Sequence, residues 1–198
     1  MKEEQGALEA SVLAALEEGD AARATTLALQ GRGPEVLRFL RSLLGDETRA
    51  GDAFSVFAER LWTSLPQFGW QCSLRSWCFL LARHAAVDHA RLGERRAGEV
   101  PLSQASEVEK LAERLRTETS SNIDRARAEL RSSFSEEDRT LLLLRLEEGL
   151  SWRELSRVFL GEQADEAALE RESARLRKRY QLAKDRFVAA AKARGLLR

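Results

Sequence analysis

The clearest chemical signal in the sequence is a cluster of basic side chains near its C-terminal end. Residues 171–198 hold ten basic and two acidic side chains, although the whole chain has a net charge of zero. Guanidinium and ammonium groups neutralise phosphates, and arginine can also donate two hydrogen bonds to a guanine edge. A solvated helix face in an arginine-rich protein has a similar composition. The segment therefore indicates either a polyanion-binding helix or a solvated helix face. The helices that precede it in the sequence help to distinguish these two interpretations.

A second segment, residues 77–91, combines a tryptophan with several charged side chains. These residues are Trp77, Arg83, Asp88 and Arg91, followed closely by Arg95 and Arg96. On one helix, an indole could stack on an unpaired base while arginines hold the backbone of a single strand. The alternative is a core tryptophan with arginines at the surface.

The same segment contains His84, Asp88 and His89, whose spacing favours one helix face and thus a metal site. No third strong ligand follows, and Cys72 and Cys78 lack the spacing of a zinc-binding pair. The sequence also lacks a glycine-rich phosphate loop, a nucleophile elbow and a paired-carboxylate signature. We therefore expect no metal, no cofactor, no catalytic residue and no small-molecule substrate. A small metal-dependent enzyme built around His84, Asp88 and His89 is therefore a weak hypothesis, weaker than the two DNA-binding hypotheses that follow below.

Helices must position these residues, because the composition favours an all-α fold. The 198 residues include 32 leucines and 29 alanines against 8 valines and one isoleucine. Leucine and alanine favour helices, whereas strands draw on β-branched and aromatic residues. No apolar run approaches the roughly 18–20 residues of a membrane span. The acidic start MKEEQGALEA does not resemble a secretory signal, and two cysteines are few, so we expect a cytoplasmic protein.

The first half of the sequence predicts a bundle of helices. Two short helices fill residues 1–30, the second ending before Gly31, and Gly33-Pro34 then opens a helix that Gly45 closes. A helix over 52–65 carries one apolar face, made of Phe54, Phe57, Leu61 and Leu65. A third strong helix covers 74–92.

The second half predicts a helix-turn-helix unit after a polar linker. Two capping boxes, Ser135 with Asp138 and Ser151 with Glu154, begin two short helices. A long basic helix follows over 165–194, with an apolar stripe of Leu169, Leu176, Tyr180, Ala183 and Phe187. This order is typical of helix-turn-helix proteins. The expected organisation is an acidic helical extension at 1–33, a helical domain at 34–97, a linker at 98–133 and a helix-turn-helix domain at 134–198.

Together, these segments resemble bacterial sigma-70 family factors, specifically the extracytoplasmic-function group. Residues 77–91 are similar to the family pattern W-L-x-x-I-A-R-N-x-x-x-D-x-x-R of region 2, with His84 at the position of the asparagine. Residues 52–62 look like its D-x-x-Q-x-x-F helix, with Ser55 at the position of the glutamine. Residues 134–145 and 148–155 resemble region 4, where residues 162–173 are an additional length of chain.

The resemblance implies two small helical domains, region 2 and region 4, that bind core RNA polymerase and promoter DNA. Its implied polymerase contacts are Asp52, Phe54, Ser55, Phe57, Leu61 and Trp62. Its implied contacts to the minus-ten element and the single-stranded non-template strand are Trp77, Arg83, His84, Asp88, Arg91, Arg95 and Arg96. Its implied contacts to the double-stranded minus-thirty-five element are Arg153, Arg171, Arg175, Arg177, Lys178, Arg179 and Lys184.

Several points stay open at this level. The second hypothesis is a helix-turn-helix regulator of sigma-like shape that does not engage polymerase. Residues 162–173 either extend the recognition helix backwards or form a separate turn. The acidic segment 1–33 either completes the first helical domain or inhibits DNA binding. An anti-sigma protein is a possible further partner.

Overall fold

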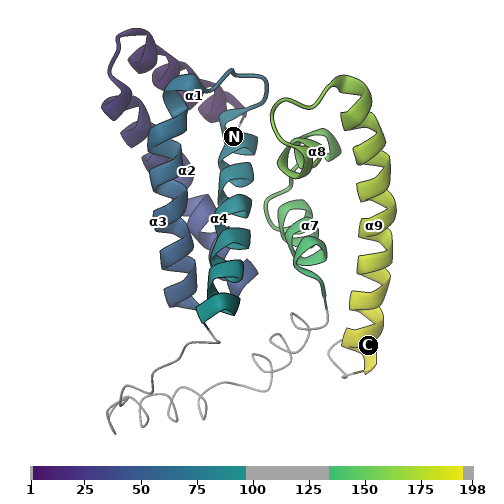
Figure 1. Ribbon diagram of the computed structural model, residues 1–198. Helices are drawn as coiled ribbons and strands as arrows, with labels where there is room; N and C mark the ends of the chain where they lie inside the picture. Colours follow the sequence, from purple (N-terminus) through teal and green to yellow (C-terminus); the bar gives the residue numbers. More distant parts are fainter. Residues whose placement is uncertain (1, 97–133, 194–198) are drawn as a thin grey trace, which may run out of the picture.

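The computed structural model describes residues 2–96 and 134–193, and within these ranges every regular element is a helix (Figure 1). Lobe 1 consists of α1 (Lys2–Glu17), α2 (Ala21–Leu44), α3 (Glu47–Ser64), the 3-10 helix η1 (Leu65–Gln67) and α4 (Leu74–Arg96). Lobe 2 consists of α7 (Glu136–Leu146), α8 (Trp152–Leu160) and α9 (Glu166–Ala193). Side chains are described except at 2–5, 89–96 and 191. The predicted all-α fold class is confirmed.

Lobe 1 contains one helix where the sequence predicted two. The helix α2 runs without interruption through Gly31, Gly33 and Pro34, so the expected end before Gly31 and start at Pro34 are wrong. Gly31 lies close to α1, because a Cβ atom there would lie 2.4 Å from a methyl carbon of Leu8, whereas one on Gly33 would lie at an ordinary contact distance of 3.4 Å from the ring of Phe54. Gly45 does end the helix, as predicted, with a left-handed φ of +67°.

The core of lobe 1 is built from aromatic and leucine side chains on α2, α3 and α4. Phe39 and Phe79 meet edge to face with their centroids 5.5 Å apart. From the apolar face predicted for α3, Phe57 and Leu61 are fully buried, together with Leu65 at the start of η1. Burying a side chain of this kind contributes roughly 1.5–3 kcal/mol. This face fixes α3 in rotation and leaves its opposite face outward.

Lobe 2 has the predicted helix-turn-helix order. Ser151 and Glu154 form the expected capping box, and Gly149 supplies the turn before them with a φ of +68°. Ser135 caps α7, but the Asp138 carboxylate binds α9 arginines, so the first predicted capping box is only half formed. The helix α9 begins at Glu166, so the additional residues form a short loop and then extend α9 backwards.

The two lobes pack against each other along their length. In Figure 1, α7 and α8 lie beside the helices of lobe 1, with α8 against α4 and α7 against α2. One hydrophobic cluster contains buried residues of both lobes. The predicted linker at 98–133 falls outside the described residues. In the part of the chain that the structure describes, no helix is long and apolar enough to cross a bilayer.

Candidate nucleic-acid interface

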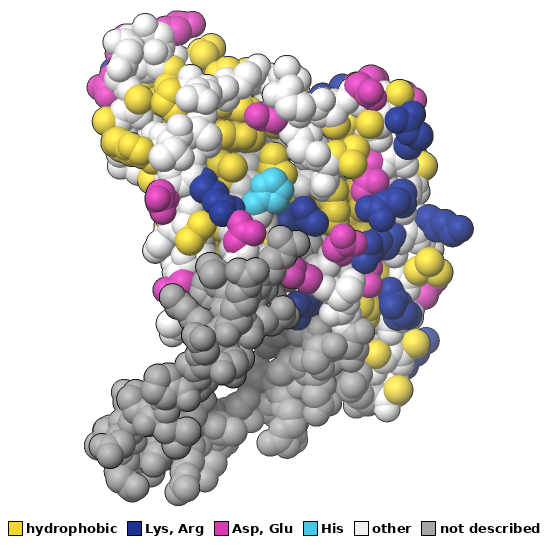
Figure 2. Space-filling view, in the orientation of Figure 1, with side chains coloured by type: hydrophobic (Ala, Val, Ile, Leu, Met, Phe, Trp, Pro, Cys, Tyr) yellow, Lys and Arg dark blue, Asp and Glu magenta, His cyan; other side chains and the backbone are white. Residues whose placement is uncertain are grey.

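The outer face of α9 carries the most accessible basic side chains predicted for DNA contact. Its inner stripe, which includes the buried Leu169, Leu176 and Ala183, packs on lobe 2 and turns the opposite face to solvent. Figure 2 shows Lys and Arg side chains gathered over this helix, and the exposed Arg177 guanidinium lies 5.9 Å from the centroid of the Trp152 ring at the start of α8. The exposed predicted residues here are Arg171, Arg177, Lys178 and Lys184. Their charges can reach phosphates without any movement of the helix.

Two arginines of α9, Arg179 and the more exposed Arg186, bind carboxylates of α7. The Nε atom of Arg179 donates to an Asp138 carboxylate oxygen at 2.7 Å, and its side chain also binds Ser135 and Glu137. Arg186 donates to the other Asp138 oxygen at 2.9 Å. Burial alone raises the pKa of Asp138, but the hydrogen bonds and positive charges outweigh it and leave that pKa below its ordinary value. Arg179, which the sequence predicted to contact DNA, instead links α9 to α7 within lobe 2.

The other two predicted residues of lobe 2 are exposed but paired. Arg175 donates to both carboxylate oxygens of Glu172 at 2.7 and 2.8 Å. Arg153 donates to Glu166 at 2.6 Å, across the turn between α8 and α9. The Arg153–Glu166 pair is exposed on both sides and contributes about 0–1 kcal/mol, so a phosphate can replace Glu166 at little cost. The Glu172 side chain, in contrast, is only 9% exposed, so its pair with Arg175 is costly to break.

Trp77 is a core residue. Its side chain is 3% exposed, and its ring stacks on Phe68 with centroids 4.3 Å apart and an angle of 16°. No base can stack on this indole in the conformation described. The structure therefore agrees with the alternative interpretation of this segment, which is a core tryptophan with arginines at the surface.

The charged residues of α4 near Trp77 lie at the surface, and several have partners. Arg83 sits over the ring of Phe159 in lobe 2, 4.7 Å from its centroid. Asp88 accepts a hydrogen bond from Arg60 at 2.6 Å. His84 is exposed as a residue, but partial burial of its ring, and then the charges of Arg83 and Arg60, lower its pKa. The side chains of Arg91, Arg95 and Arg96 lie outside the described residues.

The residues predicted to contact polymerase divide between the two faces of α3. Phe57 and Leu61 are fully buried, and Phe54 is half-buried, so these rings and chains support the core. The outward face carries Asp52, Ser55 and Trp62, with Trp62 53% exposed.

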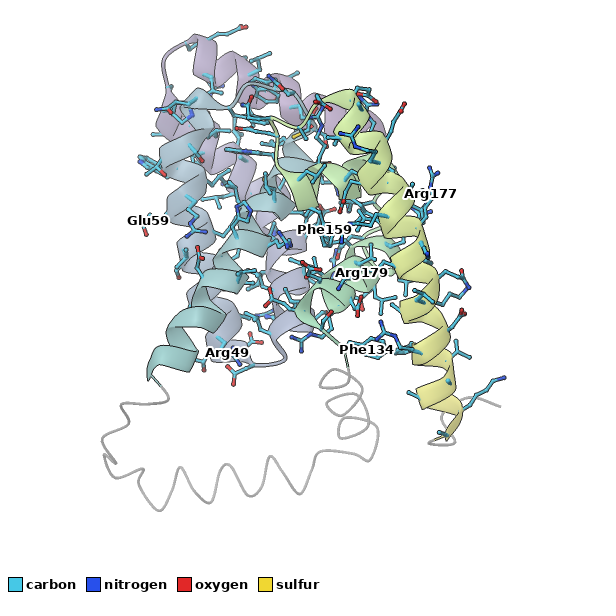
Figure 3. The ribbon with its side chains drawn as sticks, turned by 45° about the vertical axis from the view of Figure 1, so that its right-hand side comes forward. Arg49, Glu59, Phe134, Phe159, Arg177 and Arg179 are labelled. Carbon is cyan, nitrogen blue, oxygen red and sulfur yellow. The ribbon has the colours of Figure 1, made fainter. Side chains whose placement is uncertain are left out.

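Glu59 also lies on this outward face, and Figure 3 shows it pointing away from the molecule. The sequence analysis missed this residue. Its position four residues after Ser55 and three before Trp62 would have predicted it, because such spacings share a helix face.

A metal centre finds no support among the described side chains. No group of three histidine, cysteine, aspartate or glutamate side chains there comes together as a metal site. The expected partner of His84 and Asp88, His89, lies outside the described side chains. Cys72 and Cys78 are free thiols.

Part of the chain matches a known protein family. Residues 30–96 match the family Sigma-70 region 2. This match makes residues 30–96, about a third of the chain, similar to sigma-70 region 2. The matched residues run from within α2 to the end of α4, and they include the outward face of α3 and the charged surface of α4. The resemblance to sigma-70 region 2 indicated by the sequence is therefore confirmed over these residues.

The fold around the region 2 domain is also similar to a solved structure. The solved structure is that of the sigma factor RpoE in complex with the anti-sigma factor NepR from Bartonella quintana. This chain matches it with a TM-score of 0.50 and 17% sequence identity. The similarity covers 84% of this chain and 97% of that one, so it extends beyond region 2 to lobe 2. None of the curated proteins matches the sequence.

Proposed function

We propose that this protein is an extracytoplasmic-function sigma factor, which binds core RNA polymerase and directs transcription initiation at a subset of promoters. The observation that carries the proposal is the combination in one chain of a region 2 domain with a helix-turn-helix lobe whose α9 exposes basic side chains. The proposed role is promoter recognition in the cytoplasm, and it assigns no catalysis to this chain.

Each exposed face has a proposed role. The outward face of α3, with Ser55, Glu59 and Trp62, contacts the polymerase. The surface of α4 near Arg83 contacts the minus-ten element and its non-template strand. The outer face of α9 lies in the major groove of the minus-thirty-five element, where phosphate contacts give affinity and base-edge contacts give specificity.

The proposed protein partner, besides polymerase, is an anti-sigma factor. The solved relative is described as bound to one. We place the contact with this anti-sigma factor at the interface between α4 and α8. A protein that separates the lobes, or holds them together, would alter both proposed DNA surfaces.

The polymerase contact is tested by co-elution with bacterial core RNA polymerase on a sizing column. Wild type is expected to co-elute in stoichiometric amounts. A Glu59→Lys, Trp62→Ala variant should lose about tenfold or more in affinity, because an exposed tryptophan is a typical central contact of an interface. Phe57 is unsuitable for this test, since truncating a buried phenylalanine costs about 3–5 kcal/mol of stability.

Leu13→Ala is the matched control, because Leu13 is an exposed apolar residue on α1 that is not among the proposed polymerase contacts. It should bind polymerase as wild type does. A correctly folded wild type that never associates with polymerase would contradict the proposal.

One observation favours the second hypothesis, a regulator that binds duplex DNA without polymerase. The basic face of α9 is exposed while Arg83 of the region 2 domain lies against Phe159. A free chain could therefore present α9 to DNA and little else. A filter-binding titration that finds no specific duplex site for the free chain would exclude this regulator.

A further inference from the structure

The charge of the α9 segment changes sign part of the way along the helix. Residues 162–172, which lead into α9 and form most of its first two turns, hold five acidic side chains and one basic one. Residues 173–184 hold five basic side chains and no acidic one. Among the five acidic residues, Asp165, Glu166 and Glu170 are exposed. The start of α9 is therefore an acidic surface, and its middle is a basic one.

This division decides which part of α9 suits a DNA groove. In a common helix-turn-helix complex, the N-terminal residues of the recognition helix contact the base edges. The first two turns of α9 are about 12 Å long, at 1.5 Å per residue, which is about the width of the major groove. Entry by this end would place exposed carboxylates between two rows of phosphates, which repel them. The charge of the groove is complementary to the middle of α9 instead.

A line of exposed residues runs along the outside of α9. Ala167, Arg171, Ala174, Lys178 and Gln181 follow one another at spacings of three and four, so they share one helix face. In Figure 1, α9 forms one edge of the molecule, and α7 and α8 lie on one side of it. The outer line is the side that a duplex can approach.

Two uncharged side chains extend this line beyond the basic residues. Gln181 is exposed, and the neighbouring Leu182 is 55% exposed. Neither residue contributes to the buried stripe of the helix. An exposed leucine in a basic surface has no partner of its own type among the phosphates, but the major groove offers one in the methyl group of thymine.

We propose that α9 enters the major groove with its middle, where Gln181 and Leu182 select A·T base pairs, and that its acidic first two turns stay outside. This inference rests on the proposed function and names residues that determine its sequence specificity.

The chemistry of Gln181 fits adenine. Its Nε2 atom donates one hydrogen bond to the Asp185 carboxylate at 3.0 Å, which orients the amide. An amide nitrogen carries two hydrogens, so a second donor and the carbonyl oxygen remain for a base. Adenine offers the matching pair in the major groove, because its N7 accepts and its N6 donates.

The flanking charges supply affinity without sequence preference. Arg177 and Lys184 are exposed and lie seven residues apart, on one side of the outer line. Contacts of such residues to phosphates fix the position of a helix on the duplex, whereas base contacts specify the sequence.

The position of α9 in the groove is tested by one substitution at two places. Ala167 and Ala174 are both exposed and lie two turns apart on the outer line. Ala174→Glu should lower the affinity for duplex DNA about tenfold or more, because its carboxylate would enter the groove. Ala167→Glu is the matched control and should change the affinity less than about twofold. An equal loss in both variants, or a larger loss for Ala167→Glu, would overturn the proposal.

The probe is a duplex selected from a pool of random sequences by the full chain bound to bacterial core RNA polymerase, with binding measured by fluorescence anisotropy. We expect the selected double-stranded segment to contain A·T pairs. Selection without any preference for A·T pairs in that segment would also overturn the proposal. Gln181→Ala should relax the selection at one adenine.

The contact of Leu182 with a thymine methyl group has its own test. Deoxyuridine, which lacks this methyl group, replaces each thymine of the selected segment in turn. One replacement should weaken binding by wild type about fourfold, the effect of one methyl group returned to water. The same replacement should leave binding by Leu182→Ala unchanged, whereas equal effects on both proteins would contradict the role of Leu182. If wild type fails to bind polymerase, only the proposed function is contradicted, because selection and binding can be repeated with the free chain.

Discussion

Asp138 joins α7 to α9 through a carboxylate that two arginines share. Its side chain is nearly buried, and Arg179 and Arg186 bind one oxygen each. Since α9 carries the proposed DNA face, this residue helps to hold the helix that presents that face. The pKa of Asp138 lies below its ordinary value, so its ionised form stabilises the folded lobe.

We predict that Asp138→Asn lowers the free energy of unfolding by about 1–3 kcal/mol at pH 7, the cost of hydrogen bonds to a charged group. A carboxyl whose pKa is lowered by folding contributes stability above its ordinary pKa of 3.8, and that contribution is lost as the pH falls below that value. The loss should therefore shrink at pH 3. Urea unfolding at both pH values measures it.

The control is Asp185→Asn, because Asp185 is exposed on α9 and bonded to Gln181. It should change stability little at either pH. An equal loss for Asp138→Asn at pH 7 and pH 3 would mean that its ionisation contributes nothing.

At the residue scale, the sequence predicted helix faces better than it predicted individual roles. The periodicity of α3 placed Phe57 and Leu61 in the core, and the structure confirms it. The resemblance nevertheless added both to the polymerase contacts, since a linear motif takes no account of which face each residue occupies. Trp62 and Trp77 show the same limit, because one is exposed and the other stacks on Phe68, a difference set by tertiary packing.

At the scale of single elements, α2 shows that a glycine has two different uses. Gly33 lies inside the helix against Phe54, whereas Gly45 ends it in a left-handed conformation. The sequence analysis treated both as helix boundaries. Turn signals and packing signals use the same residue type, so only the neighbouring helix distinguishes them.

We predict opposite effects of alanine at these two positions. Gly33→Ala should stabilise the protein by up to about 1 kcal/mol, because alanine favours a helix interior and its Cβ atom would meet the Phe54 ring at an ordinary 3.4 Å. Gly45→Ala should destabilise it by about 1 kcal/mol or more, because alanine tolerates a φ of +67° poorly. Thermal unfolding of the two variants compares them directly. Destabilisation by Gly33→Ala would mean that the Phe54 ring cannot accommodate the added methyl group.

At the scale of the whole molecule, the order of the lobes was predictable and their contact was not. Capping residues and composition placed a helical bundle before a helix-turn-helix unit. The contact between Arg38 and Glu148 spans 110 positions of the sequence and leaves no periodic trace in either segment. The packing of one lobe on the other therefore becomes visible only once both lobes are folded.

The hydrophobic cluster shared by the lobes has a thermal consequence. Removing apolar surface from water lowers the heat capacity, so the apolar part of such a contact weakens on cooling. The shared cluster includes Leu155 and Val158 of α8, a helix that packs on α4 of lobe 1. Cooling should thus part the lobes before it affects either core. The rate at which Ellman's reagent modifies Cys72, a half-buried thiol on which charges of lobe 2 act, should then rise relative to that of the buried Cys78 as the temperature falls.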